Sequence, residues 1–130
     1  MYEFNIILDQ PFDKALERVR EALMAQQMGI VSEVDVQSVI KQKLQKDIPS
    51  YRILGACSPK FALRVLDAEP NAGTLLPCNL VVRDDGESRT LVSCMDPVAV
   101  MGLSASTEVN AVADEAKEKL LKVMASLEND

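Results

Sequence analysis

The chain contains no histidine, and histidine is the only side chain whose ordinary pKa lies near neutrality. Sites that bind a metal through imidazole are thereby excluded, and so are Ser-His and Cys-His nucleophile pairs. Any acid or base would have to be an Asp, Glu, Lys, Cys or Tyr whose pKa is shifted by its surroundings. The absence of histidine therefore counts against enzyme activity but does not exclude it.

Cysteines are few, and long apolar runs are missing. The three cysteines, Cys57, Cys78 and Cys94, are odd in number and widely spaced, which is typical of free thiols in a reducing compartment. No run approaches the roughly 20 apolar residues that span a bilayer. The opening MYEFNIILDQ lacks the basic stretch and apolar run of a secretory signal. We therefore expect a cytoplasmic protein with no membrane partner.

Acidic residues exceed basic ones, 20 against 14, which gives a net charge of −6. Such a chain has no general attraction for phosphate backbones, so we expect no nucleic-acid partner. Of its 130 residues, 48% are hydrophobic and 26% are charged, the balance of a globular protein. This length suits one domain with its own core. We expect a single domain over residues 1–130.

Apolar periodicity predicts the order of the elements. Strands are expected at 2–8, 30–36, 51–57, 77–85 and 89–96. Helices are expected at 11–28, 36–46 and 59–69, with a short helical or irregular segment after Pro97. The chain closes with a helix of about twenty residues whose apolar face comprises Val109, Val112, Ala113, Ala116, Leu120, Val123 and Leu127. That helix is long enough to cross a whole sheet.

Particular residues predict where elements begin and end. Pro11 suits the first turn of the first helix, and Gly29 suits its end. Ser58 can cap the helix that follows it, because its hydroxyl can accept from free backbone N–H groups. Asp85-Gly86 is typical of a tight hairpin turn, which needs a residue that accepts a positive φ.

The order of strands and helices predicts an α+β fold in a single two-layer domain, with helices mainly on one face of the sheet. The strands alternate rather than running solidly apolar, which favours a partly antiparallel sheet with one wetter face. An exposed face or edge would then be open to a partner chain. We expect that partner to be a second copy, in a homodimer.

Two segments carry a resemblance to a known family. YRILGACSPKFALRVL and NAGTLLPCNLVVRDDGESRTLVSCMDP resemble the paired signature of the domain of unknown function 302 family, Gly-x-Cys-x-Pro followed by Leu-Leu-Pro-Cys-Asn. PFDKALERVREAL and EVDVQSVIKQKL are also similar to that family. The resemblance implies a curved, mostly antiparallel sheet with helices against one side, similar to TATA-box-binding-protein-like folds, and implies no mechanism. Cys94 and the VMGLSAS run depart from the pattern.

The two signature cysteines have a reactive and a structural interpretation. Cys57 precedes a helix start, where the macrodipole is expected to lower its pKa. Cys78 follows Pro77 at a strand start, with Asn79 beside it. If the two strands are parallel, the thiols lie roughly 15–20 Å apart; if antiparallel, as the resemblance favours, they share one sheet end. Alternatively, both are apolar filler in the core, as Cys94 is expected to be.

Three functions remain open at this stage. The favoured one is a homodimeric module that binds a small molecule or cofactor, of unknown identity, between sheet and helices. The second is a redox or sulfur-transfer protein with Cys57 as nucleophile and Cys78 as resolving thiol. The third is a structural or partner-docking domain. The candidate ligand-binding residues are Cys57, Ser58, Lys60, Pro77, Cys78 and Asn79.

Two ligand sites receive less support from the sequence. No metal site is predicted, because two thiolates alone do not complete the four ligands that zinc usually takes. Lys60 and Arg64 lie one helical turn apart near a helix start and could hold an anion there, although such a pair is more often part of a solvated face.

Overall fold

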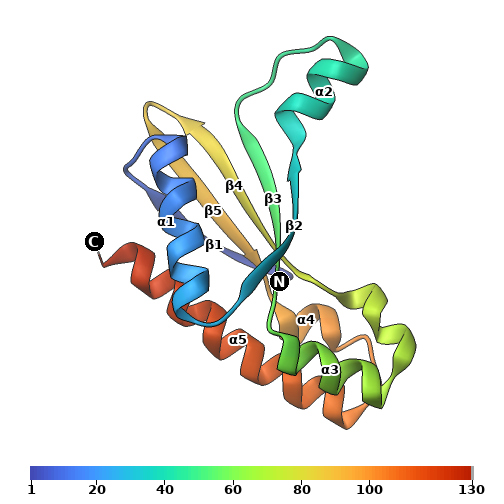
Figure 1. The fold of residues 1–130 in the computed structure, drawn as a ribbon. Helices are drawn as coiled ribbons and strands as arrows, with labels where there is room; N and C mark the ends of the chain where they lie inside the picture. Colours follow the sequence, from blue (N-terminus) through green and yellow to red (C-terminus); the bar gives the residue numbers. More distant parts are fainter. Residues whose placement is uncertain (130) are drawn as a thin grey trace.

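The computed structural model describes residues 1–129, so Asp130, the last residue of the expected domain, lies outside the described residues. The fold is built on a five-stranded sheet with the strand order β1-β5-β4-β3-β2, and every neighbouring pair is antiparallel (Figure 1). The strands are β1 (Glu3–Leu8), β2 (Gly29–Asp35), β3 (Tyr51–Cys57), β4 (Cys78–Gly86) and β5 (Arg89–Met95). The expected α+β class is confirmed, and the pairing is wholly antiparallel.

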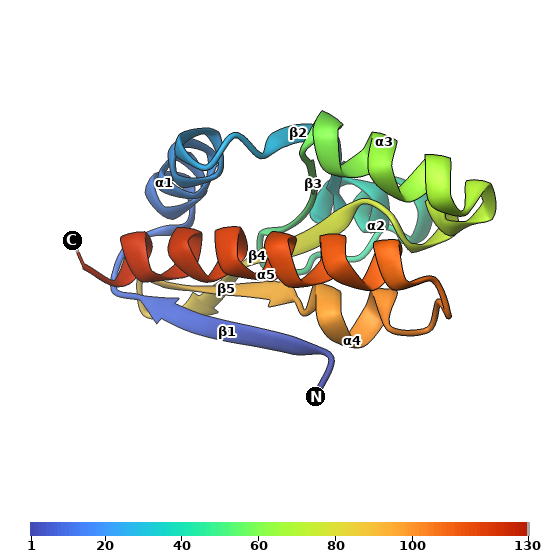
Figure 2. The same ribbon diagram turned by 90° about the horizontal axis from the view of Figure 1, so that it is seen from below.

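Helices cover one face of this sheet. They are α1 (Phe12–Ala25), α2 (Val36–Leu44), α3 (Pro59–Ala68), α4 (Pro97–Met101) and α5 (Thr107–Glu128), with a 3-10 turn η1 (Pro70–Leu75) between α3 and β4. Of these, α1 and α5 pack against the sheet, and α5 runs along most of its width (Figure 2). All seven residues of the apolar face predicted for the last helix are buried.

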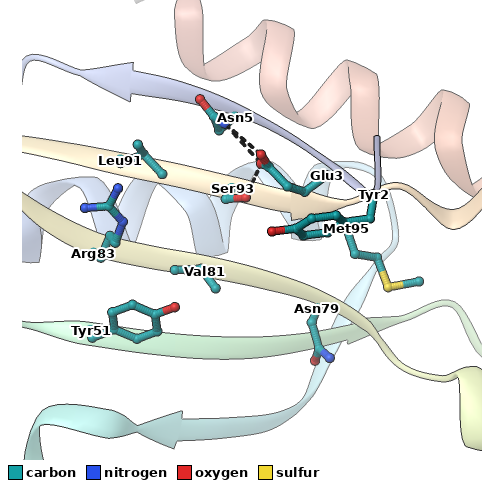
Figure 3. A pocket seen from close by; sticks show the side chains of 10 residues that line it. All are labelled: Tyr2, Glu3, Asn5, Tyr51, Asn79, Val81, Arg83, Leu91, Ser93 and Met95. Atoms are coloured by element: carbon teal, nitrogen blue, oxygen red, sulfur yellow. Dashed lines mark hydrogen bonds between the residues drawn. The ribbon is translucent and has the colours of Figure 1, made fainter. Parts of the chain in front are cut away.

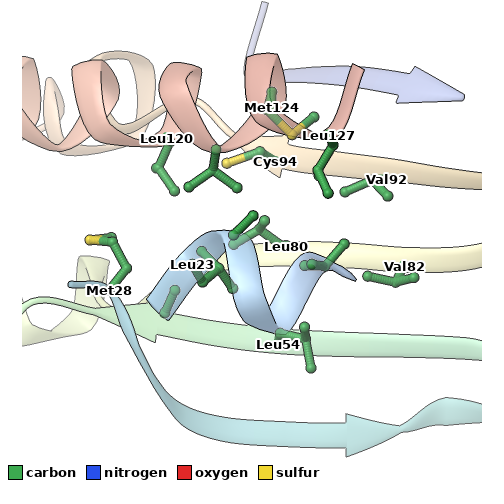
Figure 4. Close-up of a cluster of buried hydrophobic side chains, with 14 of the residues drawn as sticks. Leu23, Met28, Leu54, Leu80, Val82, Val92, Cys94, Leu120, Met124 and Leu127 are labelled. Carbon is green, nitrogen blue, oxygen red and sulfur yellow. The ribbon is translucent and has the colours of Figure 1, made fainter. Parts of the chain in front are cut away.

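The main core lies between the sheet and the helices α1 and α5 (Figure 4). Because strand side chains alternate, every second residue of β3, β4 and β5 points into it. Leu54, Leu80 and Val92 are fully buried there against Leu23 of α1 and Leu120 of α5. At roughly 1.5–3 kcal/mol for each buried aliphatic side chain, this layer is the chief source of the fold's stability.

A second, smaller core joins α3, η1, α4 and α5 beyond one end of the sheet. Val65, Met101 and Val112 are buried together in it. An ion pair between Lys117 and Asp96 ties α5 to the start of α4, where the Asp96 carboxylate also accepts from the Val98 N–H. These contacts fix the end of the sheet at which Cys57 and Cys78 lie.

Helix α2 stands apart from both cores. It projects beyond the sheet on the connection between β2 and β3, and none of its residues is buried (Figure 1). Its start is capped by the Asp35 side chain, which accepts from the Ser38 N–H. Its apolar residues Val39 and Leu44 are exposed. Within residues 1–129, no helix is both long and apolar enough to cross a membrane.

The predicted ends of two helices need correction. Helix α1 stops at Ala25, because the N–H groups of Gln26 and Gln27 bond back to carbonyls of the last turn and Gln27 takes a φ of 59°. Gly29 therefore opens β2 instead of ending α1. Ser58 does lie at the start of α3, but its side chain makes no capping hydrogen bond.

The hairpin between β4 and β5 turns two residues later than predicted. Glu87 and Ser88 occupy the turn, with φ values of 54° and 59°. Gly86, with φ at 86°, still pairs with Arg89 and lies next to an irregularity in the ladder. The glycine thus shapes a bulge, and the tight turn is made by two residues for which positive φ is unfavourable.

Candidate functional site

The two signature cysteines lie at the same end of the sheet, as the antiparallel alternative predicts. Ala56 of β3 is directly opposite Cys78 of β4, which places Cys57 one residue further along β3. From the usual strand spacings, the two cysteine Cα atoms are then about 6 Å apart. All three cysteines are free thiols.

The environment of these thiols opposes ionisation. Burial raises the pKa of Cys57, and its Sγ lies 3.6 Å from the carbonyl oxygen of Ser58. The expectation that the helix start lowers this pKa is therefore wrong, because desolvation outweighs the macrodipole. Burial, and secondarily the neighbouring Cys57, raises the pKa of Cys78 to about 12. Both thiols are protonated at neutral pH.

Little space is left beside the cysteines. Cys57, Ser58 and Cys78 line a cavity between the sheet, α3 and α5 whose volume is about 10 Å³, with Phe61 and Met101 among its other walls. A cavity of that size holds about one water molecule, whereas ligand pockets usually measure about 300–1,000 Å³. In this conformation the thiols act as small apolar groups within a packed region.

The other predicted site residues are divided between different surfaces. Pro77, which follows a cis peptide bond, lies close to Gly55 of β3. Lys60 is exposed on the first turn of α3. Asn79 belongs to the face of the sheet opposite the helices, since it pairs with Gly55 one residue beyond Cys78. The six predicted residues therefore do not converge on one pocket.

The anion site predicted at Lys60 and Arg64, near the start of α3, is affected by ion pairs that Arg64 forms. The guanidinium of Arg64 forms ion pairs with Glu108 at 3.1 Å and with Glu115 at 2.6 Å, both on α5. These carboxylates raise its pKa, Glu108 contributing most. Arg64 thus holds α3 against α5, and a bound anion would have to displace its two carboxylate partners.

A hollow that sequence reasoning did not identify lies on the open face of the sheet. Its volume is about 350 Å³, within the usual range for small-molecule sites. Side chains from β1, β3, β4 and β5 surround it (Figure 3). They are Tyr2, Glu3, Asn5, Tyr51, Asn79, Val81, Arg83, Leu91, Ser93 and Met95.

Charged groups stand at opposite sides of this hollow. The carboxylate of Glu3 accepts from Asn5 and Ser93, and these hydrogen bonds, Ser93 first, lower its pKa. Glu3 is therefore ionised at neutral pH. Arg83 lies across the hollow and pairs with Asp85 at 3.2 Å (Figure 3). The hollow carries one fixed negative and one fixed positive group.

Several polar groups around the hollow have no partner. In the described part of the chain, no hydrogen bond engages the hydroxyls of Tyr2 and Tyr51 or the amide of Asn79. The apolar side chain of Val81 lies between them, and Leu91 lines the hollow beside Arg83 (Figure 3). An apolar floor with unpaired donors and acceptors at its rim is the usual composition of a small-molecule site.

The alternation of residues along the strands predicts part of the lining of this hollow. Alternation assigns Val81 and Arg83 to one face of β4 and Leu80 and Val82 to the other. It does not indicate which face the helices leave bare, nor that β1 lies beside β5. Of the residues around the hollow, only Asn79 is among the candidate ligand-binding residues predicted from the sequence, and that prediction placed it in a pocket beside the cysteines, on the other side of the sheet.

Titratable groups do not gather elsewhere into a metal site. Among residues 1–129, no group of three or more Cys, Asp or Glu side chains is arranged to hold a metal ion. The hollow itself offers hydrogen-bonding groups, one guanidinium and apolar contact.

Comparisons with known proteins agree with this architecture. No curated protein matches the chain. A crystal structure of an uncharacterized conserved protein DUF302 from Bacillus stearothermophilus superposes with a TM-score of 0.88, covers 98% of each chain and is 22% identical in sequence, which shows the shared fold. The family model described as Domain of unknown function DUF302 matches residues 4–127. The chain therefore belongs to the DUF302 family.

Proposed function

We propose that this protein is a binding module that holds a small molecule in the hollow on the open face of its sheet. The observation that carries the proposal is the set of unpaired polar groups around an apolar floor: the hydroxyls of Tyr2 and Tyr51 and the amide of Asn79 beside Val81. The favoured class, a small-molecule module, is thus retained, and its site moves from the cysteines to the opposite face.

The lining specifies the chemistry of the ligand. Arg83 provides a cation that suits a carboxylate or sulfonate, although it would have to share its guanidinium with Asp85. The rings of Tyr2 and Tyr51 can contact a flat apolar body, and their hydroxyls can bond to polar groups at its edge. A planar molecule with one anionic group fits these demands. Glu3 would disfavour a second anionic group at the other side.

The cysteine-dependent alternative receives less support. A nucleophilic thiol needs a depressed pKa or an adjacent base, and burial instead raises the pKa of both Cys57 and Cys78. Their proximity in the sheet is compatible with a disulfide, but both are free. The hollow is therefore the better-supported site.

The test uses 8-anilinonaphthalene-1-sulfonate, a planar aromatic sulfonate, as the probe. Titration followed by fluorescence should give saturable binding to the wild-type protein. Arg83→Gln and Tyr51→Ala should each weaken it by at least about fivefold, the loss expected for about 1 kcal/mol. Lys41→Gln, which removes an exposed cation on α2, is the matched control and should leave binding unchanged. Equal binding by all four proteins would contradict the proposal.

A further inference from the structure

We infer that the open face of the sheet is also the surface on which a second copy of this chain packs, around a two-fold axis near Ser93. The inference goes beyond the ligand site, and the dimer itself does not depend on a ligand. It rests on three features of that face: its exposed apolar side chains, its size and the positions of Glu3 and Arg83.

The face carries apolar side chains in two rows that each cross four strands. Strand register aligns Ser93, Val81, Ile53 and Val34 in a row across β5, β4, β3 and β2. A parallel row joins Ile7, Leu91, Arg83 and Tyr51 across β1, β5, β4 and β3. Ile7 is 54% exposed and Val34 44%, although both belong to strands. In residues 1–129 no helix packs on this face, so these side chains remain in contact with water.

The size of the face is that of a small protein interface. Five strands about 4.8 Å apart and about 20 Å long give roughly 480 Å² per copy in projection. Two such faces would bury roughly 960 Å² in total, the size of weaker, transient protein interfaces. No helix hinders the approach of a second copy to this twisted face, because the helices lie on the other side of the sheet or beyond its ends (Figure 2).

The charges of the face complement one another under two-fold symmetry. Glu3 lies beside Met95 on one side of Ser93, and Arg83 lies beside Leu91 on the other. From strand spacings the two charged residues are about 16 Å apart, too far to pair within one chain. A two-fold axis that lies in the interface near Ser93, perpendicular to the line from Glu3 to Arg83, exchanges their positions. Each Glu3 then faces the partner's Arg83, whose guanidinium it shares with Asp85 of the partner's own chain, and two ion pairs form.

The same packing would complete the hollow. In one chain the hollow has a floor and rim but is open on the side away from the sheet (Figure 3). A second face placed over it supplies a roof and joins two hollows of about 350 Å³. Enclosure of this kind strengthens each hydrogen bond and ion pair to a ligand, because water is excluded. Only this consequence rests on the proposed function.

Analytical ultracentrifugation without any ligand tests the inference. The wild-type chain should sediment as a dimer, and Val81→Arg, at the centre of the face, should sediment as a monomer because two buried cations would repel each other. Leu63→Arg, at a residue 62% exposed on α3, introduces the same charge elsewhere and should remain a dimer. A monomeric wild-type chain, or a dimeric Val81→Arg, would overturn the inference.

Charge reversal provides a second measurement if Val81→Arg fails to fold. Glu3→Arg and Arg83→Glu should each raise the dimer dissociation constant by at least about tenfold, because like charges then face each other. The double variant should recover most of the wild-type affinity. Recovery supports the reciprocal pair, and its absence excludes it. Because this assay contains no probe, a dimer that fails to bind the sulfonate would refute the ligand site alone.

Discussion

Gly55 of β3 lies so close to Pro77 that a Cβ atom on residue 55 would come 2.6 Å from the Cγ atom of the proline. The hydroxyl oxygen of Ser32 on β2 would lie closer still to that Cβ atom. Gly55 belongs to the Gly-x-Cys-x-Pro segment, and Pro77 to Leu-Leu-Pro-Cys-Asn. One reason for the paired signature is therefore steric: the glycine admits the proline that precedes β4.

This contact predicts that Gly55→Ala destabilises the fold. A methyl group there overlaps a proline ring that cannot move away by changing a rotamer, so we expect the free energy of unfolding to fall by about 1–3 kcal/mol. Urea denaturation measures the change. Gly29→Ala is the matched control, because a Cβ there meets only the Cys57 carbonyl oxygen at 3.7 Å, an ordinary contact. Equal losses from the two variants would show that backbone freedom, and not the proline, decides the cost.

The buried thiols predict a loss of stability at alkaline pH. The pKa of Cys78 is raised from 9.0 to about 12 in the folded chain, so above pH 9.0 the unfolded chain releases a proton that the folded chain keeps. The contribution is complete below pH 9.0 and is lost as the pH rises toward 12. While only the unfolded thiol titrates, the free energy of unfolding should fall by about 1.4 kcal/mol per pH unit.

Cys78→Ala isolates this effect from the other groups that titrate at high pH. Urea denaturation at several pH values above 9.0 should give a shallower decline for the variant than for the wild-type chain. Parallel declines would mean that Cys78 ionises as readily in the folded chain as in the unfolded one. The comparison concerns slopes, so a constant cost of removing the sulfur does not affect it.

Sequence patterns predicted the elements well because their signals are local. The apolar spacing from Val109 to Leu127 identified the face of α5 that is buried, and alternation identified all five strands. The antiparallel arrangement of Cys57 and Cys78 came from the family resemblance, since the residues alone allowed either direction.

What the sequence could not provide depends on packing between distant segments. The pKa of Cys57 is governed by burial, which follows from how α3 meets the sheet and not from its position before a helix. The hollow required knowing that β1 pairs with β5, which brings Glu3 beside Met95 across more than ninety positions of chain. No periodicity within either strand contains that information.

The last prediction concerns the hairpin turn, where Glu87 and Ser88 occupy positions of positive φ that usually hold glycine, asparagine or aspartate. Ser88 has a φ of 59°, a left-handed conformation that costs a residue with a Cβ roughly 1 kcal/mol relative to glycine. Ser88→Gly should therefore raise the free energy of unfolding by up to about 1 kcal/mol in urea denaturation. It leaves the contact between Glu87 and Arg89 intact, whereas a change at Glu87 would remove it.

Gly86→Ala provides the opposite control: nothing blocks a Cβ there, but its φ of 86° disfavours alanine, so stability should fall. Opposite effects of the two substitutions would establish that backbone conformation, and not side-chain contact, governs this turn. A loss of stability in Ser88→Gly would instead show that the greater freedom of glycine in the unfolded chain outweighs relief of the left-handed conformation.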